Sequence, residues 1–257
     1  MMCFAIRAKV TCCFISLFVA GMVQAADLPQ TIARIKPSVV GIATLHKTRI
    51  PPMNFIGTGF IVGDGLTIIT NAHVVKSATT TDTGGEVLGI ITGNGEGTDF
   101  RRATVVHTDP DHDLAQLKIT GSPLPTLEIG NSDAVQEGQL LAFTGFPLGM
   151  VLGFHHVTHR TMISAITPVT MPALHSQNLN PRMIMQLRNT PFQVFQLDGT
   201  AYPGNSGSPL YDPETGEVLG IINKVFVKGS KETAISQPSG ITYAIPSKFI
   251  QELLNRR

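Results

Sequence analysis

The sequence has very little cysteine. Its 257 residues contain three cysteines, Cys3, Cys12 and Cys13, and all of them lie near the N-terminus. The rest of the chain therefore has no thiol for a disulfide, a nucleophile or a thiolate metal site. A chain without disulfides must be stabilised by its hydrophobic core, and a chain of this length is long enough to bury one.

Neither sign of charge is in excess, because 19 Lys and Arg stand against 18 Asp and Glu. This balance gives no electrostatic basis for binding nucleic acid or an anionic membrane surface. The apolar run at residues 10–23 follows Arg7 and Lys9 and ends in small residues, as a secretory signal peptide does. We expect cleavage after Ala25, which removes residues 1–25, leaves residues 26–257 exported and leaves no stable membrane insertion. An uncleaved anchor is the alternative.

Gly, Thr, Val and Ile are plentiful, and short strand-like runs alternate with turn signals. The runs lie at 39–45, 57–62, 67–70, 87–91, 103–107 and 114–119, and then at 139–143, 155–166, 193–197, 209–211, 218–225 and 240–244. They predict an all-β fold of two packed six-stranded antiparallel β-barrels, at about 37–121 and 138–246. We also expect a short helix at 28–35, a long loop at 170–193, and a C-terminal helix at 247–255 with Ser247 as N-cap.

Ser206 stands between two glycines in Gly204-Asn205-Ser206-Gly207 and is the candidate nucleophile. A serine hydroxyl needs a base to take its proton and donors to receive the charge that forms on the attacked carbonyl. Glycines allow a sharp turn that aims successive amides at one point. The Gly204 and Ser206 amides are the candidate oxyanion hole. Taken alone, the same residues are also typical of a plain turn.

His73 is the candidate base, because it follows an apolar run and is expected at the end of a strand. A histidine in such a place is more often structural, so the prediction depends on an acidic partner. Asp113 is the candidate partner. It enters the strand-like run 113–119, and alternation of side chains predicts that it faces inward, where a carboxylate needs hydrogen bonds. Asp109 precedes a proline and is predicted to be a turn residue, and Asp111 stands further from the strand.

The order His, Asp, Ser is that of the chymotrypsin-type proteases. Five motifs in order resemble the protease domain of the HtrA/Deg family of trypsin-like serine proteases. They are Gly57-Thr58-Gly59-Phe60-Ile61-Val62, Thr70-Asn71-Ala72-His73-Val74-Val75, His112-Asp113-Leu114-Ala115, Pro203-Gly204-Asn205-Ser206-Gly207-Ser208-Pro209-Leu210 and Gly240-Ile241-Thr242-Tyr243-Ala244-Ile245-Pro246-Ser247.

The resemblance implies a chymotrypsin-like double barrel, with His73 and Asp113 from the first barrel and Ser206 from the second. It implies a periplasmic protein, with secretion beyond the cell as the alternative, and leaves open a homotrimer built through the segment before Val39. Two features depart from the family pattern. Family members usually carry a PDZ domain after the last helix, where this chain ends at Arg257. Ser208 also stands where the family commonly has a second glycine.

The resemblance also indicates the substrate pocket, with walls at 200–203 and 222–225. Thr200 stands six residues before Ser206, where trypsin-like enzymes specific for Lys or Arg carry an aspartate. We therefore expect a small or medium neutral P1 residue, with an acidic P1 selected by Lys224 as the alternative. Asp198 is expected in a structural hydrogen bond. The candidate substrate-binding residues are Thr200, Ala201, Tyr202, Asn223, Lys224 and Val225.

His155, His156 and His159 lie close together, but nothing else in the sequence has metal-ligand spacing, so we expect no metal and no cofactor. The sequence thus predicts an exported serine endopeptidase that acts on unfolded or flexible polypeptides through an acyl-enzyme. The alternative is a catalytically latent protease-fold module that binds peptides or acts as a chaperone.

Overall fold

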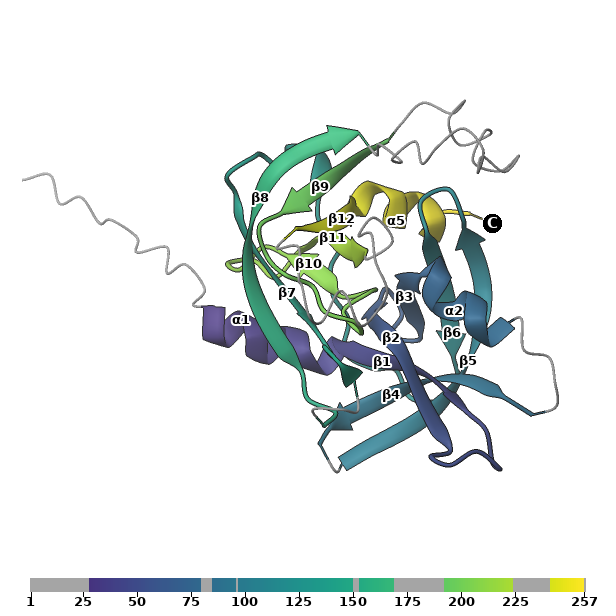
Figure 1. Ribbon diagram of the computed structural model, residues 1–257. Coiled ribbons are helices and arrows are strands. Elements are labelled where there is room, and N and C mark those ends of the chain that lie inside the picture. The colour runs from purple at the N-terminus through teal and green to yellow at the C-terminus, as the bar shows by residue number, and fades with distance from the viewer. Residues whose placement is uncertain are drawn as a thin grey trace, which may run out of the picture.

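The computed structural model describes residues 28–79, 85–95, 97–149, 153–168, 192–223 and 241–256. They form two closed antiparallel barrels of six strands each, which confirms the predicted double barrel (Figure 1). The predicted signal peptide and nearly all of the predicted loop at 170–193 lie outside the described residues. No helix in the described ranges is long and apolar enough to cross a membrane.

The first barrel has the strand order β1-β2-β3-β6-β5-β4, and β4 pairs with β1 to close it. Its interior is filled by branched aliphatic side chains, including Ile42, Ile61 and Ile68. The strands are β1 (Val39–Leu45), β2 (Met53–Val62), β3 (Thr67–Asn71), β4 (Val87–Asn94), β5 (Gly97–Asp109) and β6 (Leu114–Ile119).

The second barrel has the order β10-β11-β12-β9-β8-β7 and is closed by the pairing of β7 with β10. Phe143, Ile163 and Leu197 belong to its separate interior core. The strands are β7 (Leu140–Gly145), β8 (Val157–Pro168), β9 (Gln193–Leu197), β10 (Pro209–Tyr211), β11 (Val218–Asn223) and β12 (Thr242–Pro246).

A third apolar cluster joins the two barrels. Phe60 and Ile69 of the first barrel belong to it, together with Tyr211 and Ile221 of the second. Because these side chains are almost completely buried, the cluster fixes the position of one barrel relative to the other. Any site at the junction of the barrels therefore has a rigid base.

The helices are short and pack on the outside of the barrels (Figure 1). They are α1 (Leu28–Ile35), α2 (Ala72–Thr79) and α5 (Ser247–Leu254), with short 3-10 turns η1 (Lys36–Ser38) and η2 (Ser132–Ala134). The helix α2 was not predicted. The predicted N-cap was wrong, because Ser247 is the first residue of α5 and its hydroxyl donates to the Gly130 carbonyl at 2.7 Å.

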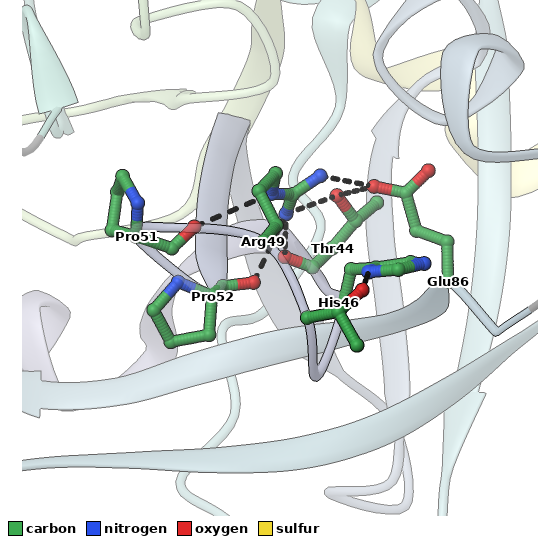
Figure 2. A network of polar contacts seen from close by, with 7 residues as sticks. Thr44, His46, Arg49, Pro51, Pro52 and Glu86 are labelled. Carbon is green, nitrogen blue, oxygen red and sulfur yellow. Dashed lines mark hydrogen bonds and ion pairs between the residues drawn. The ribbon is translucent and has the colours of Figure 1, made fainter.

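Arg49 fixes the loop between β1 and β2 (Figure 2). Its guanidinium donates to Glu86 at 2.6 Å, to the Thr44 carbonyl at 2.9 Å and to the Pro52 carbonyl at 3.1 Å. Hydrogen bonds from Thr44 and Arg49 lower the pKa of the Glu86 carboxyl below its ordinary value. The network ties the loop to Glu86, the residue that precedes β4. Polar contacts therefore hold one end of the first barrel.

Candidate active site

His73 lies in the first turn of α2, directly after β3. The prediction placed it at the end of a strand, and the structure adds that the chain turns into a helix there. The carbonyl oxygen of Asp113 holds this turn, because it accepts hydrogen bonds from the Ala72 amide at 3.0 Å and from Asn71 Nδ2 at 3.2 Å. The His73 side chain therefore projects from a fixed junction, and 34% of it is exposed.

The Asp113 carboxylate binds His73 at two points. Oδ1 accepts the His73 backbone amide at 2.8 Å, and Oδ2 lies 2.6 Å from His73 Nδ1. An ionised carboxylate can only accept hydrogen bonds, so Nδ1 carries the proton and Nε2 keeps its free lone pair. Asn223 Nδ2 also donates to Oδ2, at 2.8 Å. In such an arrangement an imidazole can act as a base while a carboxylate fixes its orientation.

Asp113 reaches His73 by a route other than the predicted one. The strand β6 begins only at Leu114, and Asp113 has a φ of +52°, in the left-handed region. The alternation of side chains along β6 therefore does not extend to residue 113, and the predicted inward-facing strand position was wrong. Aspartate is one of the few residues besides glycine that adopts this conformation readily. The left-handed turn directs the carboxylate to His73.

Ser206 lies in the loop between β9 and β10 and is 6% exposed. Thr58 of β2 holds this loop: its amide donates to the Ser206 carbonyl at 2.9 Å and its hydroxyl donates to the Gly204 carbonyl at 2.7 Å. Thr70 Oγ1 donates in turn to the Thr58 carbonyl at 2.7 Å. The loop of the second barrel is thus fixed to the two strands that lead to His73. Thr58 belongs to one of the sequence motifs, but its support of this loop was not predicted.

Gly57 contacts the surroundings of both Ser206 and His73. A Cβ added at residue 57 would lie 2.8 Å from Val74 Cγ1 and 3.2 Å from the Ser206 carbonyl oxygen. Val74, the neighbour of His73, and the backbone of Ser206 therefore both pack against Gly57. A side chain at residue 57 would force these two groups apart. These contacts bring Ser206, His73 and Asp113 to one region where the barrels meet.

The peptide groups before Gly204 and Ser206 are oriented by hydrogen bonds to their carbonyls. The Pro203 carbonyl accepts the Leu148 amide at 2.6 Å, and the Asn205 carbonyl accepts the Ser208 amide at 3.0 Å. In a trans peptide the N–H points opposite to the C=O, so the Gly204 and Ser206 N–H groups point away from these partners. Within the described part of the chain neither N–H donates to another group. Gly204 has a φ of +103°, which glycine adopts without strain.

A family model, the trypsin-like peptidase domain, matches residues 57–221, a span that contains His73, Asp113 and Ser206. The chain belongs to this family. Curated relatives of the chain include a probable periplasmic DegP-like serine endoprotease of Pseudomonas fluorescens strain Pf-5. It is 27% identical over 274 residues, which cover 91% of this chain and 50% of the relative. The mitochondrial serine protease HTRA2 of Bos taurus is 31% identical over 236 residues, or 89% and 43% of the two chains.

The chain thus spans half or less of the length of these two relatives. Solved structures with the same fold include an HtrA-type protease, AlgW, with a decapeptide. Its TM-score is 0.63 at 24% sequence identity, and the match covers 89% of this chain and 66% of the AlgW chain. The crystal structure of Deg5 has a TM-score of 0.62 at 23% identity and covers 87% and 90%.

Four of the six predicted substrate-binding residues lie in the described ranges, and Lys224 and Val225 lie outside them. Thr200, Ala201 and Tyr202 lead from β9 into the Ser206 loop. The Ala201 amide donates to Thr242 Oγ1 at 2.8 Å, which ties this segment to β12. Asn223 is fully buried, and its side chain donates to Asp113. No sequence pattern indicates this contact, because its partners are 110 residues apart.

Asp198 accepts hydrogen bonds from the Thr161 hydroxyl at 2.8 Å and from the Met162 amide at 2.7 Å. The expected structural role of Asp198 is therefore confirmed. Two nearby histidines also contribute to packing. The His156 ring lies 2.9 Å from the Val39 carbonyl, the His159 ring stacks on Phe143, and burial lowers the pKa of both. Among the described residues, no three His, Cys, Asp or Glu side chains are grouped as metal ligands.

Proposed function

We propose that this chain is an exported serine endopeptidase that cleaves unfolded or flexible polypeptides through Ser206, His73 and Asp113. The observation that carries the proposal is the pair of hydrogen bonds between His73 and the Asp113 carboxylate. These bonds leave Nε2 of His73 available as a base. Membership of the trypsin-like peptidase family supports this chemistry. Relatives named as periplasmic endoproteases support the periplasm as the compartment.

In the proposed mechanism, His73 Nε2 takes the proton of Ser206 Oγ while this oxygen attacks the carbonyl carbon of the peptide bond. Asp113 stabilises the imidazolium that forms, and the N–H groups of Gly204 and Ser206 donate to the oxyanion. His73 then gives its proton to the leaving amine, the C–N bond breaks, and an acyl-enzyme remains. Water, deprotonated by His73, hydrolyses the ester and restores Ser206.

The proposed substrates have a small or medium neutral P1 residue, because Thr200 offers no carboxylate to a Lys or Arg side chain. Mass-spectrometric mapping of cleavage sites in a denatured proteome measures this preference, and cleavage mainly after Asp or Glu would favour selection by Lys224 instead. The homotrimer and the cleavage after Ala25 remain predictions. Analytical ultracentrifugation and N-terminal sequencing of the mature protein test them.

The decisive experiment compares Ser206→Ala with Ser208→Ala. Ser208 is a buried serine of the same loop, so it is a matched control. Ser206→Ala should lower the rate of casein cleavage by at least about 10³-fold and abolish labelling by a fluorophosphonate probe, because the nucleophile is lost. Ser208→Ala should keep both activities. The proposal is wrong if the wild type neither cleaves nor reacts, or if both variants behave alike. A latent binding module would bind peptides without cleavage in the wild type.

A further inference from the structure

A second pair of aspartate and histidine lies immediately before Asp113 in the chain. Asp109 is the last residue of β5, and 3% of its side chain is exposed. Its Oδ2 lies 2.8 Å from His112 Nδ1 and 2.6 Å from Arg256 Nη2. Its Oδ1 accepts the backbone amides of Asp111 at 3.1 Å and of His112 at 3.2 Å. One buried carboxylate thus closes the turn that leads into Asp113.

Asp109, His112 and Arg256 form a polar cluster, and its third member follows the C-terminal helix α5. Arg256, just beyond α5, also donates to the Thr108 carbonyl at 3.4 Å. The His112 ring stacks on Phe249 of α5, with centroids 3.9 Å apart and planes at 19°, and meets the edge of Phe192 at 4.7 Å. Figure 1 shows the end of α5 beside the strands β5 and β6. The contacts therefore connect α5 to the residue next to Asp113.

The cluster satisfies the buried charge of Asp109. Burial by itself raises the pKa of the Asp109 carboxyl, but hydrogen bonds from His112 and the nearby positive charge of Arg256 outweigh it and hold the pKa below its ordinary value. Asp109 is therefore ionised at neutral pH and accepts all four hydrogen bonds. Removing one donor leaves this buried carboxylate with three of its four hydrogen bonds, and a local shift of the turn would compensate for the lost one.

Asp113 needs such support because of its backbone. A left-handed conformation at a residue other than glycine persists when the surrounding structure fixes it. On one side Leu114 is held in β6 by its pairing with Asn71 of β3 and Asp109 of β5. On the other side His112 is held by the Asp109 carboxylate and the Phe249 ring. Asp113 is the single residue between these two fixed points.

We propose that Asp109, His112 and Arg256 are positioning residues for Asp113, so that the C-terminal end of α5 sets the alignment of the His73–Asp113 pair. This inference rests on the proposed function, because it assigns the cluster to the same reaction. None of the three residues touches the substrate in this proposal. Their effect on the reaction passes through the backbone of residues 112 and 113.

The test compares Arg256→Met, Arg256→Lys and the control Arg34→Met in the full mature chain. Arg34 is an exposed arginine of α1 that donates to the Thr215 carbonyl at 3.0 Å in the second barrel, so its loss removes a similar surface contact elsewhere. For a peptide substrate, Arg256→Met should lower kcat about tenfold with KM nearly unchanged, because the pair is misaligned but the pocket is intact. Arg256→Lys should restore part of the loss, and Arg34→Met should match the wild type.

A second measurement does not depend on turnover. The proton that His73 Nδ1 shares with Asp113 over 2.6 Å should give a far-downfield proton NMR signal in the free protein. Arg256→Met should shift or broaden this signal at a temperature where the variant is folded by circular dichroism, whereas Arg34→Met should leave it in place. The inference is overturned if Arg256→Met keeps the wild-type signal and kcat. If the wild type shows the signal but cleaves nothing, the proposed function fails. The NMR comparison of Arg256→Met with Arg34→Met then still decides whether the cluster positions Asp113.

Discussion

Among single residues, Thr58 shows how one buried side chain can join both barrels at the site. It is completely buried in β2. Its hydroxyl donates to the Gly204 carbonyl at 2.7 Å and accepts the Phe146 amide at 3.2 Å, while its amide binds the Ser206 carbonyl. Both partners of the hydroxyl belong to the second barrel. The conformation of the Ser206 loop therefore depends on a residue of the first barrel.

Thr58→Val tests this dependence, because valine has the shape of threonine but cannot hydrogen-bond. The change leaves the Gly204 carbonyl and the Phe146 amide without their partner, at a cost of about 1–3 kcal/mol for each buried group. We expect a lower free energy of unfolding in urea and a kcat reduced by about tenfold or more as the oxyanion amides shift. Thr67→Val in β3 is the control. It removes a hydroxyl that donates to Asp64, and it should keep kcat. A Thr58→Val variant with wild-type kcat would contradict the assignment.

At the level of elements, α5 contributes to the core as well as to the positioning cluster. Its residues Phe249, Ile250 and Leu253 are buried in the apolar cluster that joins the two barrels. The sequence predicted a helix here, at 247–255, and the structure has it at Ser247–Leu254. The helix is only eight residues long, so its stability comes from this packing and not from helix propensity.

Leu253→Ala should therefore lower the free energy of unfolding by about 2–5 kcal/mol, since Leu253 is fully buried and its removal leaves a cavity. Leu254→Ala removes the same atoms from a half-buried neighbour and should cost about 1 kcal/mol. Urea titrations of both variants measure the difference. Equal losses would show that α5 does not pack on the core as described.

The elements also show where sequence reasoning stops. Short runs rich in Thr, Val and Ile, separated by turn signals, predicted the strands. They did not predict α2, since the helix is short and its direction is set by the bonds from Ala72 and Asn71 to the Asp113 carbonyl. The left-handed turn at Asp113 was missed for a similar reason. Its φ depends on contacts from β3 and α5, which no local pattern of residues records.

For the whole molecule, the strand-like runs and the order of the motifs predicted the double barrel. The candidate roles of His73 and Asp113 predicted a pair, and the structure places Nδ1 and Oδ2 of this pair 2.6 Å apart. The supporting residues could not be predicted in this way. Asn223 meets Asp113 across 110 positions, and Arg256 meets Asp109 across 147. Such contacts follow from the packing of barrels and helix, and a single sequence contains no periodic signal for them.

Two half-buried histidines, His156 and His159, make the stability of the whole fold depend on pH. Burial lowers the pKa of His156 and His159 below the ordinary value of 6.5. In this case the unfolded chain binds protons that the folded chain does not, so stability increases with pH across the titration. The stability is fully present above about pH 6.5 and decreases as the pH falls below that value.

Carboxylates act in a separate range of pH. Asp64 has its pKa lowered to about 2, chiefly by a hydrogen bond from Lys118, and the pKa values of Glu86 and Asp109 are also lowered, from 4.5 and 3.8. Groups with a lowered carboxyl pKa lose their contribution only as the pH falls below these ordinary values. Changes in the free energy of unfolding at pH 5 and above therefore reflect the titration of the histidines and not of these carboxylates.

Urea unfolding at pH 7.5 and pH 5.2 should accordingly give a lower free energy of unfolding at the acidic pH. His159→Phe keeps an aromatic ring against Phe143 but cannot take up a proton, so it should reduce the difference between the two pH values. His156→Gln keeps a side-chain donor for the Val39 carbonyl, and the double variant should have the smallest difference. A double variant as sensitive to acid as the wild type would show that other groups control the stability in this range. Above pH 7 the wild type and the His159→Phe variant should differ only by the change in packing, because neither carries a charge at residue 159 there.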